Sequence, residues 1–478
     1  MKYNLPMTVQ DFINAKKLNH RPLPLLLVIS ISFILWMLFY PAYMSADSLV
    51  QYQQALAGSY EDWHPPVMAI FMHYILLLGG GISLVTLLQT LAGCLGVYLL
   101  AKEILRQKNI PIQKQTWAPF YILMILILPV SPLPFYLMIF LKDTWILIGL
   151  IWIVFIGLRI YKIGHKSSKA YVLHYIILAL LMALVFITRY NAIVLMPVFF
   201  ILLFYNSKRL SKKGESIIPV VFWSILPLFL SIAARKQLNG SFPIKKMYPE
   251  HQVMALESVG ALIQNPENGN YVPYVKSNLS PNYKEAYYPG NVASVMNWAG
   301  SQKTLNQQTF VITDQRIKKE YTDLVVHAPF TLINVKLQGF YNMIKPSTGK
   351  YWFHGQLDEN PYGLVQNETF KKIRLGWQRL ANNIHGIFLL NFISGEHIVW
   401  LIVNIALLVF FFLKKQMHCI LFIILLVPLG YYFSYMLACT GDDFRFMYPA
   451  TLLVQIVSLS LLFSKNKSEH SKIISTET

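Results

Sequence analysis

The chain has 478 residues, of which 55% are hydrophobic and only 13% are charged, and its mean hydropathy is +0.45. Soluble domains carry roughly 25% charged residues, and several apolar runs here reach the ~20 residues that cross a bilayer, which excludes a soluble globular protein. The net charge of +19 is typical of cationic loops beside anionic lipid, and no basic stripe with interleaved aromatic residues suggests a nucleic-acid partner.

Ten apolar segments are predicted to cross the membrane. The first, about residues 23–43, follows Lys16, Lys17 and Arg21, so the positive-inside rule places the N-terminus in the cytoplasm. The others are expected at about 82–101, 117–130, 142–159, 171–188, 192–206, 217–234, 397–413, 418–438 and 446–463. Every turn predicted on the cytoplasmic side carries a lysine or arginine cluster. This count places both termini in the cytoplasm.

The spans divide the chain into five parts. These are a cytoplasmic N-terminus at 1–22, a transmembrane module at 23–235 with its first external loop at 44–66, an extracytoplasmic domain at 236–395, C-terminal transmembrane helices at 396–463 and a cytoplasmic tail at 464–478. Pro65 and Pro66 open a short apolar stretch that predicts a juxtamembrane or half-inserted helix. The domain should be mainly helical, with amphipathic helices near 250–264, 314–344 and 368–390. Thr313 should cap the second of these helices, and Pro329 should kink it.

The ionisable residues at span edges that do not flank the cytoplasm all fall on the extracytoplasmic face. They are Asp47, Asp62, His64, Lys142, Asp143, Arg189, Asp442, Asp443 and Arg445. Solvated helix ends, helix caps and local ion pairs explain such residues too, and these alternatives stay open. However, carboxylates can deprotonate an acceptor hydroxyl, and arginines can hold a phosphate leaving group. Because a polyprenyl phosphate presents its head at this face, the pattern predicts transfer of a lipid-phosphate-linked group outside the membrane.

The chain resembles the GT-C fold glycosyltransferases, the broad group that includes the protein O-mannosyltransferases and the aminoarabinose transferases of lipid A. The resemblance covers about 23–235 and 397–463. It is carried by Asp47 in the first external loop, His64-Pro65-Pro66, Lys142-Asp143 at a span start, Arg189-Tyr190-Asn191 and Asp443-Phe444-Arg445-Phe446-Met447-Tyr448-Pro449 at the last span. It implies a polytopic α-helical membrane protein with a GT-C-like fold. It also implies that Asp47 is the base for an inverting attack on a polyprenyl-phosphate sugar.

Candidate site residues follow from both lines of reasoning. We predict catalytic roles for Asp47, Asp62 and His64, binding of the donor phosphate by Lys142, Arg189 and Arg445, and supporting roles for Glu61, Asp143, Tyr190, Asp442 and Asp443. Several relatives carry Asp-Glu where this chain has Asp47-Ser48, so Glu61 or Asp62 is the candidate for a second carboxylate. Tyr351, Trp352 and His354 form an aromatic cluster that can pack on an acceptor sugar or anchor the domain at the lipid interface.

We therefore expect an integral membrane hexosyl- or related transferase in the plasma membrane, with its active site on the extracytoplasmic face. Its partners are a polyprenyl-phosphate sugar, membrane lipid and a glycan or lipid acceptor. A cysteine-free exported domain is typical of a bacterial source. No metal-ligand spacing occurs, so we expect no cofactor and no structural metal, and a divalent-ion requirement stays open. The alternatives are a polymerase or ligase of lipid-linked glycans, and a transporter or flippase, which would show mid-span charges in matched halves.

Overall fold

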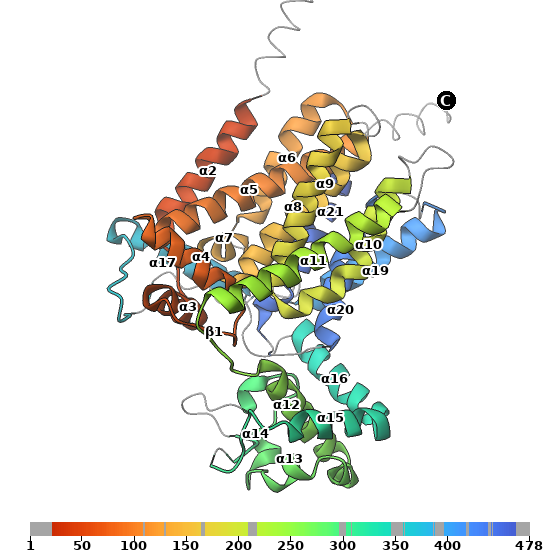
Figure 1. The fold of residues 1–478 in the computed structure, drawn as a ribbon. Helices are drawn as coiled ribbons and strands as arrows, with labels where there is room; N and C mark the ends of the chain where they lie inside the picture. Colours follow the sequence, from red (N-terminus) through yellow and green to blue (C-terminus); the bar gives the residue numbers. More distant parts are fainter. Residues whose placement is uncertain are drawn as a thin grey trace, which may run out of the picture.

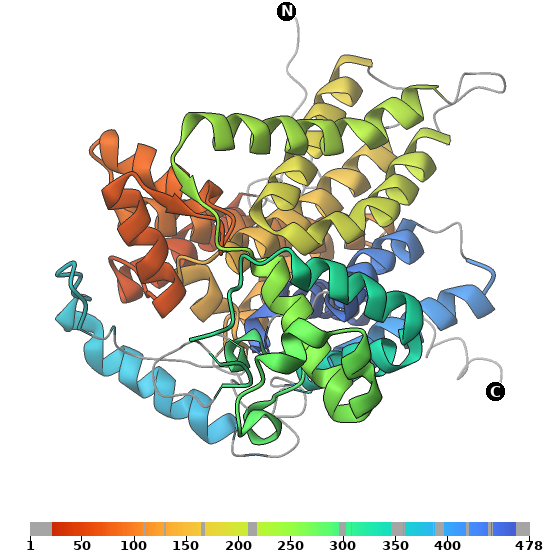
Figure 2. The same ribbon diagram turned by 60° about the horizontal axis from the view of Figure 1, so that its bottom comes forward.

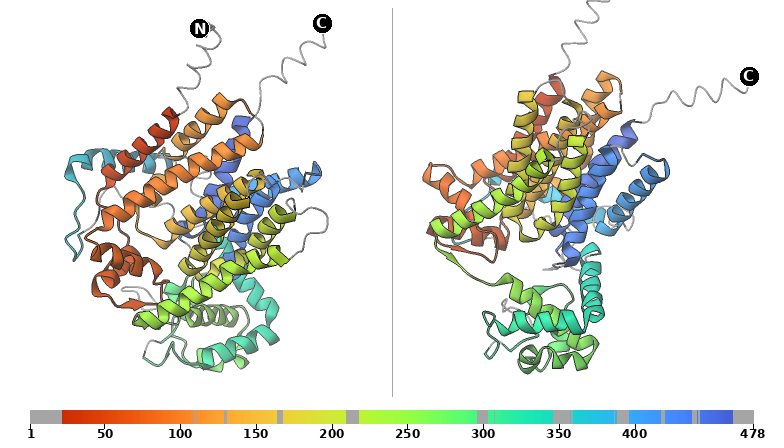
Figure 3. Two further views of the ribbon diagram at one scale, coloured as in Figure 1. Left: turned by 45° about the horizontal axis from the view of Figure 1, so that its top comes forward. Right: turned by 45° about the vertical axis from the view of Figure 1, so that its right-hand side comes forward.

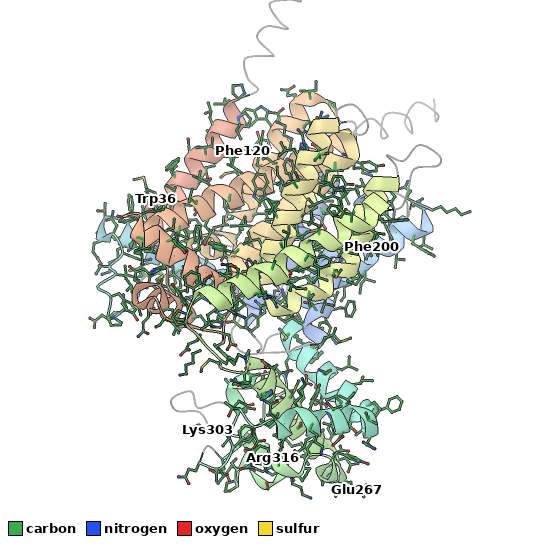
Figure 4. All side chains as sticks on the ribbon, viewed as in Figure 1. Trp36, Phe120, Phe200, Glu267, Lys303 and Arg316 are labelled. Atoms are coloured by element: carbon green, nitrogen blue, oxygen red, sulfur yellow. The ribbon has the colours of Figure 1, made fainter. Side chains whose placement is uncertain are left out.

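The chain folds into a bundle of long apolar helices with a smaller helical unit at one end (Figure 1). The computed structural model describes residues 22–108, 110–128, 131–163, 168–208, 218–295, 303–306, 308–345, 357, 359–385, 387, 396–416, 420–437, 441 and 443–464. In Figure 4, the labelled aromatic residues Trp36, Phe120 and Phe200 lie on the bundle, whereas Glu267 and Arg316 lie on the smaller unit. Side-chain chemistry therefore changes from one part to the other.

A helix overlaps each of the ten predicted spans. These helices are α2 (Leu23–Phe39), α5 (Ile82–Gln107), α6 (Ile112–Leu126), α8 (Lys142–Ile163), α9 (Ser168–Thr188), α10 (Met196–Lys208), α11 (Ile218–Ser241), α19 (His397–Leu413), α20 (Ile420–Leu437) and α21 (Tyr448–Ser464). Among the described residues, four stretches are long and apolar enough to cross a membrane: Ile82–Gln107, Lys142–Tyr161, Val221–Ser241 and Ile420–Leu437. They support a multi-pass membrane protein, and the count of ten spans stays a prediction.

The bundle packs closely around α5, α8 and α21. Two glycines of α5 allow this approach: a Cβ atom at Gly93 would lie 2.2 Å from the side chain of Leu137 in α7 (Leu133–Met138), and one at Gly96 would lie 2.9 Å from Ile151 in α8. Most of α21 is buried, as expected for a helix that is apolar on all sides. The start of α2 and the end of α21 lie on the side of the bundle away from the smaller unit (Figure 3). The fold thus leaves one end of the bundle open to that unit.

The segment between α2 and α5 contains more structure than the sequence predicted. The expected juxtamembrane helix forms as α4 (Val67–Leu77), but a further helix, α3 (Ala46–Ala57), precedes it. Ser45 caps α3 by accepting a hydrogen bond from the Ser48 amide at 3.2 Å. Gly58 ends the helix with a φ of 65°, in the left-handed region that favours glycine. Asp47 therefore lies in the first turn of a helix, where a carboxylate is favoured, and not in an irregular loop.

Two backbone pairings fix the ends of this segment. Strand β1 (Tyr60–Glu61) pairs in parallel with β2 (Ile244–Lys245), which follows α11. At the other end of the segment, the Tyr43 amide donates to the carbonyl of Met138, the last residue of α7, at 3.0 Å. The segment that carries Asp47 is thus tied to two distant parts of the chain, and its position relative to α8 is defined.

The small unit, residues 249–344, has a separate core. Its helices are α12 (Pro249–Gln264), α13 (Pro273–Ser277), α14 (Tyr283–Ala286), α15 (Arg316–His327) and α16 (Pro329–Ile344), with short 3-10 turns η3 (Pro266–Asn270) and η4 (Val292–Ser294). The predicted single helix at 314–344 is wrong, because the chain breaks into two helices at Ala328, before Pro329. Thr313 does not cap it either; the Asp314 carboxylate accepts from the Arg316 amide at 2.8 Å instead.

The second part of the 236–395 segment lies away from the small unit. Helix α17 (Lys371–His385), preceded by η5 (Glu368–Phe370), packs against α2 and runs along the edge of the molecule in Figure 2. The segment predicted as one domain is therefore distributed over two places in the fold. Of the amphipathic helix predicted near 368–390, the structure forms Lys371–His385, and residues 386 and 388–390 lie outside the described residues.

Candidate active site

Charged side chains from distant parts of the chain meet where the bundle faces the small unit. They are Asp47 in α3, His64 after β1, Lys142 and Asp143 at the start of α8, Arg189 just before η2 (Tyr190–Leu195) and Arg445 in η6 (Phe444–Phe446). All but Asp143 line a cavity of about 690 Å³, whose opposite wall comes from α12, α15 and α16. With Asp443, which lines the same cavity beside Arg445, the structure thus brings together seven of the residues that the sequence predicted for one site.

Asp47 is held by two partners. One carboxylate oxygen lies 2.7 Å from a guanidinium nitrogen of Arg445, and the other lies 3.5 Å from Nε2 of His64. Burial alone would raise the pKa of Asp47, but Arg445, and to a smaller extent His64 and Lys142, outweigh it and hold the pKa well below its usual range. Asp47 is therefore ionised at neutral pH, and it is a weak base as long as Arg445 holds it.

His64 connects Asp47 to Lys142. Its Nδ1 atom lies 2.5 Å from the Lys142 amino group, while Nε2 faces Asp47. Burial, followed by the charge of Lys142, lowers the pKa of His64 to about 4, so the ring is neutral at pH 7. A protonated Lys142 amino group can only donate, so Nδ1 is assigned as the acceptor and the single ring proton is assigned to Nε2, where it points at the carboxylate. The three side chains form one line of polar contacts from Lys142 through His64 to Asp47.

Arg189 and Asp143 form a buried ion pair. Only 7% of the Arg189 side chain and 2% of the Asp143 side chain are exposed, so each charge depends on the other. The Arg189 Nε atom also donates to Asn191 at 3.1 Å, and its guanidinium carbon lies 4.9 Å from the ring centre of Tyr435 and 4.7 Å from that of Phe446. This guanidinium is held in one orientation at the cavity wall.

Arg445 lies among three carboxylates. Besides Asp47, its Nε atom lies 2.8 Å from Asp443 and 4.0 Å from Asp143. Burial opposes the charged form, but Asp443 and Asp47 raise the pKa of Arg445 above its ordinary value. The Asp443 carboxylate also accepts from the Arg445 amide at 3.0 Å, which shapes the η6 turn. An anion that enters the cavity therefore competes with carboxylates for this guanidinium.

Glu61 and Asp62 lie beside the cluster and not within it. The Lys245 amino group lies 3.9 Å from Glu61, and the Asp62 carboxylate accepts from the Met247 amide at 2.5 Å, so both support the β1–β2 pairing. Neither is among the described residues that line the cavity. Some residues predicted for the site lie outside the described part of the chain. They are Asp442, Tyr351, Trp352 and His354, together with the side chain of Tyr190.

The opposite end of the cavity carries a polar group of side chains that the sequence analysis missed. Lys336 and Tyr321 line the cavity there, and both contact the buried carboxylate of Glu257, with Lys336 at 2.6 Å. Burial, and then Glu257, raises the pKa of Tyr321, so its hydroxyl stays protonated. Lys336 also donates to the Leu437 carbonyl at 2.9 Å, which links α16 to α20. One signal was available: Glu257 interrupts the apolar face of α12 between Val253 and Ala261.

Sequence comparison adds no family. No protein-family model matches the chain, and no curated protein matches it either. Among solved structures, the chain is similar to the crystal structure of the Archaeoglobus fulgidus oligosaccharyltransferase in complex with Zn and sulfate, with a TM-score of 0.39 and 14% sequence identity. The match covers 91% of this chain and 48% of that chain, so this protein spans about half the length of that enzyme. At this distance, the function has to be inferred from the site residues themselves.

Proposed function

We propose that this protein is a membrane glycosyltransferase that moves a sugar from a polyprenyl-phosphate donor to a hydroxyl group of an extracytoplasmic glycan, lipid or polymer. The observation that supports it most is the pairing of Asp47 with Arg445 at 2.7 Å on the wall of the cavity. A carboxylate that can accept a proton and a guanidinium that can bind a phosphate are the two groups that this transfer needs. Their position at the end of an apolar helical bundle suits a donor whose lipid part lies in the membrane.

In the proposed reaction, the acceptor attacks one face of the sugar and the phosphate leaves from the opposite face. The acceptor hydroxyl attacks the anomeric carbon, its proton passes to Asp47, and a new carbon–oxygen bond forms. The bond between the anomeric carbon and the phosphate oxygen breaks on the opposite face, so the configuration inverts. Arg445, with Arg189 and Lys142, stabilises the charge that builds up on the departing polyprenyl phosphate. His64 orients the Asp47 carboxylate through its Nε2 proton.

Arg445 has a second task in this scheme. Without donor, it binds Asp47 and keeps the carboxylate a poor base. A donor phosphate that binds Arg445 draws the guanidinium away from Asp47, and the pKa of the carboxylate rises towards its usual range. Donor binding then precedes activation of the acceptor, so Asp47 becomes a competent base only when a donor is in place.

The acceptor is proposed to bind at the end of the cavity formed by the small unit. Glu257 and Lys336 neutralise one another there, and with Tyr321 they offer donors and acceptors of hydrogen bonds without a net charge. Such a surface suits a hydroxyl-rich molecule better than a second phosphate. Tyr351, Trp352 and His354 remain candidates for contacts with the acceptor sugar.

Donor turnover tests the proposal. Purified protein would be incubated with radiolabelled polyprenyl-phosphate sugars and a membrane-glycan extract, and Asp47→Asn is expected to lower transfer by about 100-fold or more. Asp314→Asn is the matched control, because this carboxylate pairs with Arg316 in the small unit, outside the cavity. Equal transfer by wild type and Asp47→Asn would assign the base elsewhere, with Asp62 tested next.

The same assay separates the alternatives. Single-sugar products support the proposed transferase, whereas progressive lengthening of a glycan would indicate a polymerase. Movement of labelled donor across proteoliposomes, with no transfer to any acceptor, would contradict the proposal and indicate a transporter.

A further inference from the structure

Helix α17 has a charge pattern that the proposed reaction does not use. The helix contains Lys371, Lys372, Arg374 and Arg379 but no acidic residue. It lies along the edge of the molecule in Figure 2, away from α12 and α15. A cationic helix on a membrane protein, outside the substrate cavity, requires a separate explanation.

Hydrogen bonds fix α17 at the end of α2. The Arg374 guanidinium is buried and donates to the Leu38 carbonyl at 2.9 Å and to the Asn367 carbonyl at 2.8 Å. The Asn367 amide in turn donates to the Tyr40 carbonyl at 3.1 Å. Because α2 is apolar up to Phe39 and is followed by the segment that carries Asp47, α17 lies level with the boundary of the apolar layer.

Two further rows of side chains face outward. Ile373 and Leu380 are 53% and 49% exposed, and the exposed side chains of Lys372 and Arg379 form a parallel row. The members of each row are seven residues apart, which is two helical turns, so each row follows the helix axis. At about 100° per residue, the apolar row borders the buried face and the cationic row lies about 100° further around. This is the arrangement of a helix that lies in the plane of a membrane surface.

We propose that α17 binds the membrane surface, with Ile373 and Leu380 among the lipid chains and Lys372 and Arg379 on anionic phospholipid headgroups. Two observations favour a lipid partner over a protein. The helix lies at the end of α2, at the boundary of the apolar layer, and its charge is opposite to that of anionic lipid. The inference does not depend on the proposed glycosyl transfer.

The contact also extends to the segment that carries Asp47. The Gln366 side chain donates to the Ala42 carbonyl at 3.3 Å, four residues after the Leu38 carbonyl that Arg374 binds. Binding of lipid to α17 should therefore restrain residues 38–44, which directly precede α3. The helix is a membrane contact that supports the position of the candidate site.

Amide hydrogen exchange of the intact protein in nanodiscs tests the inference. Peptides covering 371–385 are compared in phosphatidylcholine alone and in phosphatidylcholine with phosphatidylglycerol. We expect exchange in these peptides to be at least about fivefold slower with phosphatidylglycerol, the factor that one basic residue contributes near an anionic surface. Lys372→Gln/Arg379→Gln should abolish the difference, and Ile373→Ser/Leu380→Ser should raise exchange in both lipids.

The control variant is Lys318→Gln/Lys319→Gln, which removes two exposed lysines of α15 in the small unit. It should leave the lipid effect on 371–385 unchanged. Equal exchange in the two lipids would overturn the proposal, as would a lipid effect that persists in Lys372→Gln/Arg379→Gln. Protection by inorganic phosphate in phosphatidylcholine nanodiscs would show a binding site for free anions and would contradict a headgroup-specific contact.

Discussion

Arg445 contacts Asp47 and Asp443 through different nitrogen atoms of one planar group, which a lysine cannot reproduce. We therefore expect Arg445→Lys to lower kcat/KM for the donor by about 100-fold, although the positive charge is kept. The measurement is the initial rate as a function of donor concentration. Arg316→Lys is the control, since Arg316 forms a similar pair with Asp314 on the small unit. An unchanged kcat/KM for Arg445→Lys would contradict planar binding of the phosphate.

From the pKa of His64 we expect the stability of the folded protein to depend on pH. Its pKa falls from 6.5 to about 4 on folding, because burial and Lys142 disfavour the imidazolium. The unfolded chain therefore takes up a proton between about pH 6.5 and 4 that the folded protein does not, and the free energy of unfolding decreases as the pH falls through this window. The difference between the two pKa values corresponds to about 3 kcal/mol.

Thermal unfolding in detergent between pH 4 and 7 measures this effect. His64→Gln should show a smaller decrease in its midpoint temperature towards low pH than the wild type. His327→Gln, at an exposed histidine of α15, should behave like the wild type. The interpretation would be wrong if His64→Gln and the wild type had the same pH dependence.

The residues of the site were easier to predict than their pairings. The alternation of the predicted spans between the two sides of the membrane placed five charged residues on one face, and the structure brings them together. They are Asp47, His64, Lys142, Arg189 and Arg445. A local ion pair, such as one between the neighbours Lys142 and Asp143, was among the alternatives that the sequence left open. However, successive residues of a helix point about 100° apart, so Lys142 reaches His64 while Asp143 reaches Arg189. Such long-range partners depend on helix packing, which a single sequence does not specify.

At the scale of elements, Asp62 illustrates a structural carboxylate that the sequence could not separate from a catalytic one. It extends the two-residue β1–β2 pairing by accepting from the Met247 amide. We expect Asp62→Ala to reduce stability by about 1–2 kcal/mol through the unpaired amide, with transfer reduced less than threefold at saturating substrate. Paired measurements of unfolding and turnover check this. Asp47→Asn should show the opposite pattern, and a 100-fold loss of transfer in Asp62→Ala would restore its catalytic assignment.

The long helices were predictable because their apolar runs are long enough to cross a bilayer and are bounded by clusters of charged residues. Helix α3 was not predicted, although Ser45 at its start and Gly58 after its end are standard boundary signals. The polar composition between them suggested a loop. Pro329 was expected to kink one helix, but it begins a new one, since proline restricts the residue before it and suits the first turn.

At the scale of the molecule, the cavity has a cationic wall and a neutral polar wall that belong to different parts of the fold. Lys336 joins them by contacting Glu257 within the small unit and the Leu437 carbonyl at the end of α20. We expect Lys336→Met to raise KM for the acceptor by about tenfold, as loss of a hydrogen bond to a charged group does, with KM for the donor unchanged. Steady-state kinetics with both substrates varied provides the measurement.

Lys336→Met also leaves Glu257 without its cation, so Lys336→Met/Glu257→Gln serves as the control for a buried charge. The double variant should keep the raised acceptor KM. If it regains the wild-type value, Lys336 acts only by neutralising Glu257. If both variants raise the donor KM equally, the two walls do not bind different substrates.

The sequence did not specify how residues 236–395 divide between two places in the fold. Residues 236–395 were predicted as one domain because they share a polar composition, but composition does not record which core a helix joins. The apolar face of α12 joins the core of the small unit, whereas Arg374 of α17 binds the end of α2. Contacts between segments that are distant in the sequence therefore determine where each helix packs.

The chain order of the site has a consequence for biosynthesis. Asp47 is synthesised early, just after α2, whereas Arg445 is synthesised late, between α20 and α21. A ribosome that has inserted everything up to α20 has therefore made the acidic half of the pair without its guanidinium. If the two residues act as proposed, the nascent protein stays inactive until Arg445 has been synthesised and has reached Asp47. A chain that stalls after α20 and before Arg445 cannot consume lipid-linked sugar, so the order of the two residues along the chain delays turnover until both halves of the pair are present.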